Sequence, residues 1–232
     1  MRAEDLEDMK RLPLFNGVNP ALVEGMLKCA YLQRFPAHVE LAREGEPADF
    51  LHVIVDGSVE VYSAYRDRET TVAVLGPGSS FIVAAVILDR QYLKSARALT
   101  PARVLLIPAE AVRGAFATDA PFARSIALEL ATAYRGVVKE LKNQKLRSSL
   151  ERLTNWILVQ DAATGNTGQI ELPFDKKVLA SRLGMVPEVL SRSFAALQPY
   201  GILVCGASVK IGARDALVRL AHPTATIDDP LT

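Results

Sequence analysis

Apolar positions in the first half of the chain follow the period of β-strands. From about residue 31 to 107, short runs such as FLHVIV and TVAVL alternate with glycine turns, which is typical of a small antiparallel barrel or roll. VIVDGSVEVY is predicted to form a hairpin at Asp56-Gly57, and the polar YRDRET another turn between strands. ARVLLIP, residues 102–108, is predicted as the last strand, and a short helix within residues 14–30 precedes the whole region.

The period becomes helical after the last strand. A short helix is predicted over residues 109–118, and after Pro121 apolar residues recur every three or four positions along a helix of about 27 residues. These apolar residues are Ile126, Leu130, Ala133, Val137 and Leu141. A stripe this narrow predicts a coiled-coil seam between two chains, with packing of the helix on its own roll as the alternative.

A further helix is predicted over about residues 148–161, with Ser148 or Ser149 as its cap and Trp156 in a second hydrophobic core. Residues 175–199 then predict two short helices joined by a tight turn at Gly184. Pro187 suits the first position of the second of these helices. After them, ILVCGASVKIG is predicted to form a β-hairpin of the kind called a wing.

The second of the two short helices carries a polar face. Glu188, Ser191 and Arg192 are spaced i, i+3 and i+4, so they share the face with which a helix-turn-helix reaches base edges in the DNA major groove. Arginine can donate two parallel hydrogen bonds to guanine, and glutamate can accept one from the cytosine amino group. The predicted DNA-binding residues are Glu188, Ser191, Arg192, Lys176, Lys177 and Arg182. The alternative for this face is an ordinary solvated helix surface.

The distribution of charge and cysteine fits such a partner. Residues 1–118 carry 13 Lys and Arg against 15 Asp and Glu, whereas residues 170–222 carry 7 against 4, so positive charge lies beside the predicted DNA reader. The chain has two cysteines and no Cys/His cluster at metal-ligand spacing, so no metal site is predicted. The acidic N-terminus and the short apolar runs, of which Phe81–Leu88 is the longest, predict neither a signal peptide nor a membrane span, and hence a cytoplasmic protein.

This organisation resembles the Crp/Fnr family of bacterial transcription factors over residues 12–222. REGEPADFLHVIVDGSVEVY and LGPGSSF are similar to the β-roll of that family, with glycines at its turn positions Gly45, Gly57 and Gly78. The resemblance implies an α+β fold in three parts. They are an N-terminal cyclic-nucleotide-binding-like antiparallel β-roll (residues 1–118), a long dimerisation helix (119–147) and a C-terminal winged helix-turn-helix (148–232).

The same resemblance implies the partners of the protein. EVLSR is similar to the recognition pattern of the Fnr branch, which implies a homodimer that binds double-stranded DNA and reads a TTGA-like half-site twice, in an inverted repeat. Family members also contact RNA polymerase through surface loops. The matching segments here are the loop around Thr164 to Gly168 and the turn from Arg66 to Glu69.

The predicted effector pocket departs from the cyclic-nucleotide binders of that family. Those proteins hold the ribose with a Gly-Glu pair and the cyclic phosphate with Arg-Ser or Arg-Thr. Aligned on Phe81, the matching residues here are Val83 and Ala84, then Lys94 and Ser95. A ribose hydroxyl without its carboxylate acceptor costs about 1–3 kcal/mol, and a lysine attracts phosphate only as a point charge. We therefore expect an unknown small-molecule or gas effector other than cyclic AMP.

FIVAAVIL, residues 81–88, takes the place of the polar pocket segment. It predicts either a buried segment that packs the roll or the lining of a pocket for an apolar or flat effector, haem included. The candidate haem ligands are His38, His52 and Cys29. An iron–sulphur cluster is excluded because it needs about four cysteine thiolates. Cys29 is expected to be buried among apolar neighbours and therefore inert.

Two other classes of function are weighed against a DNA-binding regulator. A ligand-binding regulatory module that acts on a protein partner without binding DNA is the alternative. An enzyme is not predicted, because the chain has no P-loop, no G-x-S-x-G, no HExxH and no paired-carboxylate arrangement.

Overall fold

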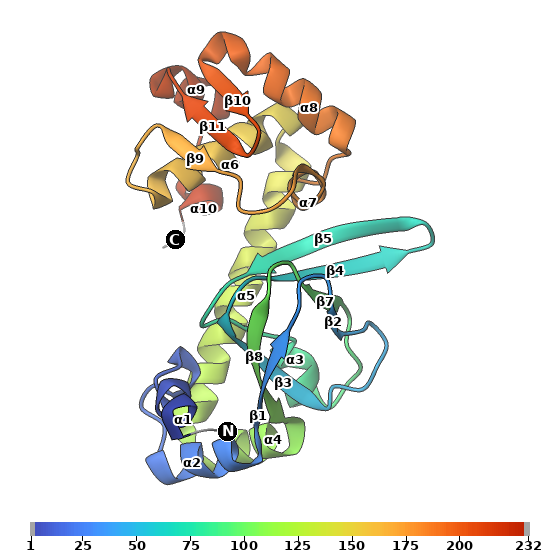
Figure 1. Cartoon of the computed structure of the whole chain (residues 1–232), viewed down its shortest axis with the longest axis vertical. Coiled ribbons are helices and arrows are strands. Elements are labelled where there is room, and N and C mark those ends of the chain that lie inside the picture. Colours follow the sequence, from blue (N-terminus) through green and yellow to red (C-terminus); the bar gives the residue numbers. More distant parts are fainter. Residues whose placement is uncertain (1–2, 230–232) are drawn as a thin grey trace. The chain divides into compact units, whose positions relative to one another are not determined.

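The computed structural model describes residues 3–229 (Figure 1). Contacts within the chain divide it into two units, residues 1–133 and residues 134–232. The long helix α5, Ala120–Leu146, begins in the first unit and ends in the second. Among the described residues, no helix is long and apolar enough to cross a membrane.

Two four-stranded antiparallel sheets form the centre of the first unit (Figure 1). One has the strand order β1-β8-β3-β6 and the other β2-β7-β4-β5. The strands are β1 Tyr31–Phe35, β2 Glu40–Ala42, β3 Phe50–Asp56, β4 Val59–Tyr65, β5 Arg68–Leu75, β6 Ser80–Phe81, β7 Ser95–Ala98 and β8 Ala102–Pro108. The predicted antiparallel β-roll is confirmed, and β8 has the predicted bounds.

The predicted hairpin at Asp56-Gly57 is wrong. β3 pairs with β6 and β8, whereas β4 pairs with β5 and β7, so the turn carries the chain from one sheet to the other. Gly57 has φ +83°, and a Cβ at this position would clash with the backbone of Pro101 and Ala102. Glycine is therefore required by both the left-handed backbone and the close approach of the neighbouring chain.

The hairpin of this region is formed instead by β4 and β5, which are drawn as two long adjacent arrows in Figure 1. Tyr65 lies opposite Arg68, so the connection consists of Arg66 and Asp67 alone. The predicted turn from Arg66 to Glu69 is therefore too long, because Glu69 lies inside β5 and its carboxylate is 2.6 Å from a guanidinium nitrogen of Arg97.

Short helices pack around the two sheets of the first unit. They are α1 Ala3–Lys10, α2 Pro20–Cys29, α3 Val83–Leu88 and α4 Ala109–Thr118, with a 3-10 turn at Pro13–Phe15. The side chain of Asn19 caps α2 by accepting a hydrogen bond from the backbone N–H of Ala21 at 2.9 Å. Helix α4 has the predicted bounds, and apolar side chains from α2, α3 and α4 join the core of the sheets.

The apolar stripe of α5 is shared between two environments. Phe122 and Ile126 are fully buried in the core of the first unit, and Leu130 packs against the same core. Ile126 therefore has no surface left for a second chain, and its assignment to the dimer seam is wrong. Ala133, Val137 and Leu141, farther along the same stripe, are exposed. The stripe changes from buried to exposed because only the first turns of α5 pack on the β-roll.

The second unit is a winged helix-turn-helix, as predicted. Its elements are α6 Ser149–Ala163, β9 Gln169–Glu171, α7 Lys176–Arg182, α8 Pro187–Ala196, a 3-10 turn Gln198–Tyr200, β10 Ile202–Cys205, β11 Ser208–Ile211, α9 Arg214–Ala221 and α10 Ala225–Asp228. Strands β10 and β11 form the wing, with β9 as the third strand of the sheet. Helix α6 begins with a capping box between Ser148 and Glu151.

Candidate nucleic-acid interface and effector region

The turn between α7 and α8 sets the direction of the second helix. Gly184 has φ +63°, in the left-handed region that glycine adopts without strain, and a Cβ there would fall on the side-chain amide of Gln144. Asp175 caps α7 by accepting a hydrogen bond from the backbone N–H of Val178 at 2.8 Å. Pro187 stands at the first turn of α8. The predicted turn and helix start are therefore both present, and Asp175 adds the cap of the first helix.

The structure places the three predicted base-reading residues on the exposed face of α8. Glu188, Ser191 and Arg192 are exposed, whereas Leu190 and Phe194 are buried in the core of the unit. Within residues 5–229, whose side chains the structure describes, neither Glu188 nor Arg192 takes part in an ion pair. Both charged groups are thus available to a ligand that approaches the start of the helix.

Other elements of the second unit also carry cationic side chains. Lys176 and Lys177 are exposed at the start of α7, and Arg182 is half-buried at its end. Lys210, which our sequence analysis did not single out, is exposed on the wing strand β11, opposite Leu203. Alternation of buried Val209 with exposed Lys210 is the signal that could have identified it, since side chains on a strand point to opposite faces in turn.

The predicted effector residues have different surroundings. Phe81 and Val83 are buried in the core of the first unit, and Ala84 is exposed on α3. The hydroxyl of Ser95 accepts a hydrogen bond from the backbone N–H of Glu44 at 2.9 Å. Residues 81–88 thus contribute buried apolar side chains to the roll, which is the first of the two alternatives for this segment.

Lys94 has a charged side chain that forms no ion pair with the described residues. Its side chain is half-buried, and burial lowers the pKa of its ammonium group. No ion-pair partner for it lies among the side chains of residues 5–229. Of the five predicted effector residues, Lys94 is therefore the one that offers a charged group to a ligand.

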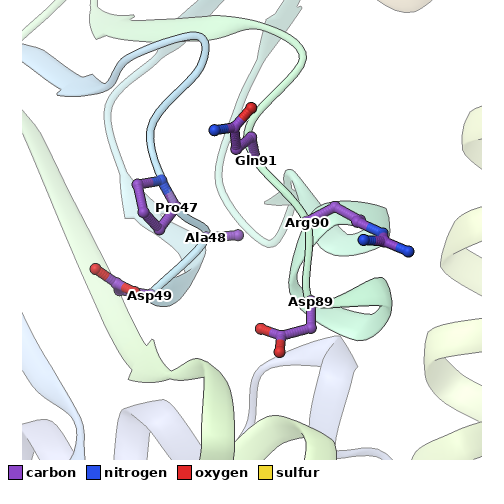
Figure 2. A pocket seen from close by; sticks show the side chains of 6 residues that line it. All are labelled: Pro47, Ala48, Asp49, Asp89, Arg90 and Gln91. Atoms are coloured by element: carbon purple, nitrogen blue, oxygen red, sulfur yellow. The ribbon is translucent and has the colours of Figure 1, made fainter.

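A pocket of about 370 Å³ lies elsewhere on the first unit (Figure 2). It is lined by Pro47, Ala48, Asp49, Asp89, Arg90 and Gln91, and none of the five predicted effector residues contributes to it. Figure 2 shows Arg90 extending away from Pro47 and Ala48. Asp89 is committed to an ion pair with Arg113, at 3.0 Å. A lining this polar does not suit an apolar or flat effector.

The three candidate haem ligands differ in accessibility. His38 and Cys29 are exposed. The expectation that Cys29 is buried is therefore wrong: it ends α2, and its thiol donates to the carbonyl of Met26 at 3.1 Å. His52 is buried in β3, with its ring stacked on Phe81 at 4.8 Å between centroids. Among the described side chains, no group of three His, Cys, Asp or Glu is arranged to hold a metal ion.

Comparison with known proteins identifies both halves of the chain. The cyclic nucleotide-binding domain family matches residues 32–119, which contain the β-roll. The Crp-like helix-turn-helix domain family matches residues 151–220, which contain the wing and the exposed face of α8. The chain belongs to the Crp/Fnr family of transcription regulators. As a member of that family it is a DNA-binding regulator and not an enzyme.

Individual Crp/Fnr relatives share the architecture over nearly the whole chain. The CRP-like cAMP-activated global transcriptional regulator of Mycobacterium tuberculosis is 24% identical over 222 residues, which cover 93% of this chain and 99% of the relative. A regulatory protein from Silicibacter pomeroyi is 27% identical, with a TM-score of 0.60 and coverage of 94% of this chain and 100% of the other. FixK2 from Bradyrhizobium japonicum has the same fold, with a TM-score of 0.73 at 23% identity over 84% of this chain and 99% of its own.

Buried His52 gives this Crp/Fnr protein a pH-dependent stability. Burial lowers the pKa of His52 from 6.5 to about 4, against the opposing effect of hydrogen bonds to the carbonyls of Leu41 and Phe50. Within the described part of the chain, its buried Nδ1 has no hydrogen-bond partner. Because the folded pKa is the lower one, the unfolded chain binds more protons between pH 6.5 and pH 4, and stability is lost as the pH falls from 6.5 to 4.

Between pH 7 and pH 5, His52 should therefore lower the free energy of unfolding by about 2 kcal/mol. Urea denaturation followed by far-UV circular dichroism measures this difference, since the single tryptophan, Trp156, reports on the other unit. In the variant His52→Leu, the free energy of unfolding should differ less between pH 7 and pH 5, by about 2 kcal/mol. An unchanged difference in the variant would assign the pH dependence to other groups.

Proposed function

We propose that this Crp/Fnr regulator acts as a homodimer that reads a TTGA-like inverted repeat and answers to an effector other than cyclic AMP. The observation that carries the proposal is the exposed face of α8, which presents Glu188, Ser191 and Arg192 together, and neither charged group pairs with a described side chain. Arginine and glutamate on one face can read a guanine and a cytosine of the same half-site. Lys176, Lys177 and Arg182 bind the flanking phosphates and hold the register of the helix.

The dimer rests on the second half of α5. An exposed apolar stripe runs along this part of the helix and is made of Ala133, Tyr134, Val137, Val138 and Leu141, continuing from half-buried Leu130. Tyr134 is 70% exposed, Val137 58% and Leu141 53%, which is unusual for apolar side chains at helical spacing. A second copy of the helix would cover them in a coiled-coil seam. The symmetric dimer then presents two copies of α8 to the two halves of an inverted repeat.

The effector acts through the β-roll. Val83 is buried and Ala84 carries no polar group, so the carboxylate that would accept a ribose hydroxyl has no replacement at either position. The M. tuberculosis relative is described as cAMP-activated, and at 24% identity that property does not carry over to a chain with these substitutions. Lys94 supplies one positive charge to an anionic effector. Haem stays an alternative, with His52 as its buried candidate ligand.

Mass analysis of any small molecule that copurifies with the protein tests the effector proposal directly. Added cyclic AMP should leave the DNA affinity unchanged. A cyclic AMP dependence of DNA binding would contradict the proposal. Added haem distinguishes the alternative, since a shifted Soret band that His52→Leu abolishes would assign haem to the roll.

RNA polymerase is the protein partner in this proposal, and the cytoplasm is the site of action. The loop from Thr164 to Gly168 follows α6 and contains three residues with positive φ, Gly165, Asn166 and Gly168, so it forms a defined surface turn. Arg66 and Asp67 at the tip of the β4–β5 hairpin provide the second contact.

A gel-shift titration tests the DNA proposal. The duplex carries two TTGA half-sites as an inverted repeat, with their centres about one helical turn apart. The matched control scrambles both half-sites and keeps the base composition. We expect binding to the repeat to be at least ~1,000-fold tighter than binding to the scrambled duplex, and both to weaken with added salt. Equal affinity for the two duplexes would refute the half-site assignment.

A further inference from the structure

Arg152 of α6 is a buried arginine that bonds to neutral acceptors only. It is 8% exposed. Its Nε donates to the carbonyl oxygen of Leu183 at 2.8 Å, and its Nη1 to that of Arg147 at 2.7 Å. Its Nη2 donates to the carbonyl oxygen of Gly184 at 3.3 Å and to the hydroxyl of Ser149 at 3.5 Å. No carboxylate pairs with it within residues 5–229, and burial lowers its pKa.

The three carbonyls belong to two different parts of the DNA-binding unit. Leu183 and Gly184 form the turn that leads into the recognition helix α8. Arg147 is the first residue after α5, where the helix ends and its carbonyl has no helical partner. One guanidinium group thus connects the end of the long helix to the start of the reading helix.

Neighbouring contacts hold the same junction. The side-chain amide of Gln144, in the last turns of α5, lies where a Cβ of residue 184 would stand. On another side, the guanidinium of Arg147 forms two hydrogen bonds with the carboxylate of Asp228 in α10, at 2.7 and 2.6 Å. The end of α5 is therefore tied both to the helix-turn-helix and to the C-terminal helix. A change in the direction of α5 would have to move α8 with it.

We propose that Arg152 is a positioning residue that fixes the angle between α5 and α8, and that it thereby sets the half-site spacing that the dimer accepts. This inference rests on the proposed homodimer and its inverted repeat. The guanidinium presents five N–H donors in a rigid fork, which allows one side chain to reach three carbonyls and a hydroxyl at fixed angles. A lysine ammonium at the same position has three donors on a single atom and cannot span them.

The experiment compares full-length wild type, Arg152→Met and Arg152→Lys on a series of inverted repeats. The distance between half-site centres is varied by one and two base pairs on either side of the best wild-type spacing, and a duplex with a single half-site is included. For wild type we expect a change of two base pairs to weaken binding by about tenfold or more. For Arg152→Met we expect the same change to weaken binding by about threefold or less, with binding to the single half-site unaltered.

Folding is checked by the fluorescence of Trp156, which lies in the same unit as Arg152. If Arg152→Met does not fold, Arg152→Lys replaces it in the comparison, because lysine keeps the charge and the aliphatic stem. The DNA affinity of Arg152→Lys should then depend less on half-site spacing than that of wild type. A wild-type profile in every folded variant would overturn the inference.

The spacing series also separates the two proposals. Failure of wild type to prefer any inverted repeat over scrambled DNA would overturn the proposed function itself. A wild-type preference for the repeat without any dependence on spacing would leave the proposed function standing and would overturn the role of Arg152.

Discussion

Replacing Arg192 with alanine should weaken binding to the TTGA inverted repeat by roughly 30- to 20,000-fold. A bidentate contact between arginine and guanine discriminates by about 1–3 kcal/mol, and a dimer makes it once in each half-site, so about 2–6 kcal/mol is lost. The side chain is exposed and has no partner among the described side chains, so its removal should leave the fold unchanged. Binding titrations on the repeat and on duplexes with each half-site position changed in turn measure the loss.

The position dependence distinguishes base reading from charge. In Arg192→Ala, discrimination should disappear at one base pair of each half-site and persist at the others. Lys177→Ala is the matched control, because this exposed cation stands at the start of α7 and not on the reading helix α8. It should weaken binding to all sequences equally and reduce the salt dependence by about one charge per protomer. A uniform loss in Arg192→Ala as well would place Arg192 on a phosphate.

The helix-turn-helix could be predicted from the sequence because its determinants are local. Three residues fix the backbone within one turn of their own position: the N-cap Asp175, the left-handed Gly184, and Pro187 at the start of α8. The local sequence is therefore enough to predict the two helices and the turn between them. The sheet pairing of the roll could not be predicted in the same way. Asp56-Gly57 is a good local hairpin signal, yet β3 pairs with the later strands β6 and β8, whereas β4 pairs with β5 and β7 in a separate sheet.

Burial along α5 shows a second limit of the pattern. An apolar stripe marks residues that avoid water, but the spacing is the same whether the cover is the chain's own roll or a second chain. Ile126 is covered by the roll and Val137 is exposed, although both belong to one stripe. Arg152 left no signal at all, because a charged residue in a helix is usually on the surface. Its burial depends on carbonyls some 30 residues away in the chain, at Leu183 and Gly184.

The double variant Val137→Glu/Leu141→Glu should convert the protein to a monomer. Both side chains are more than half exposed in the single chain, at 58% and 53%, so the substitutions leave the fold of each unit intact. In a coiled-coil seam they would place four carboxylates on the dimer axis, where burying a charge without a partner is strongly unfavourable. Sedimentation equilibrium gives the mass, and the gel-shift titration should show affinity for the inverted repeat reduced by about 100-fold or more through loss of the second half-site.

Leu128→Glu is the matched control for this variant. Leu128 is 59% exposed on the same helix, and it precedes Val137 by nine positions, which is two and a half turns, so it lies on the opposite face. Its substitution should leave both the dimer and its DNA affinity unchanged. Two results would contradict this assignment of the dimer interface: a dimer that persists in the double variant, or equal dissociation of the dimer by Leu128→Glu. Either would mean that the interface lies on another surface. With the seam on the Val137 face, the first turns of α5 pack on the roll through Ile126 and the later turns on the second chain, so a single helix connects effector domain, dimer partner and DNA reader.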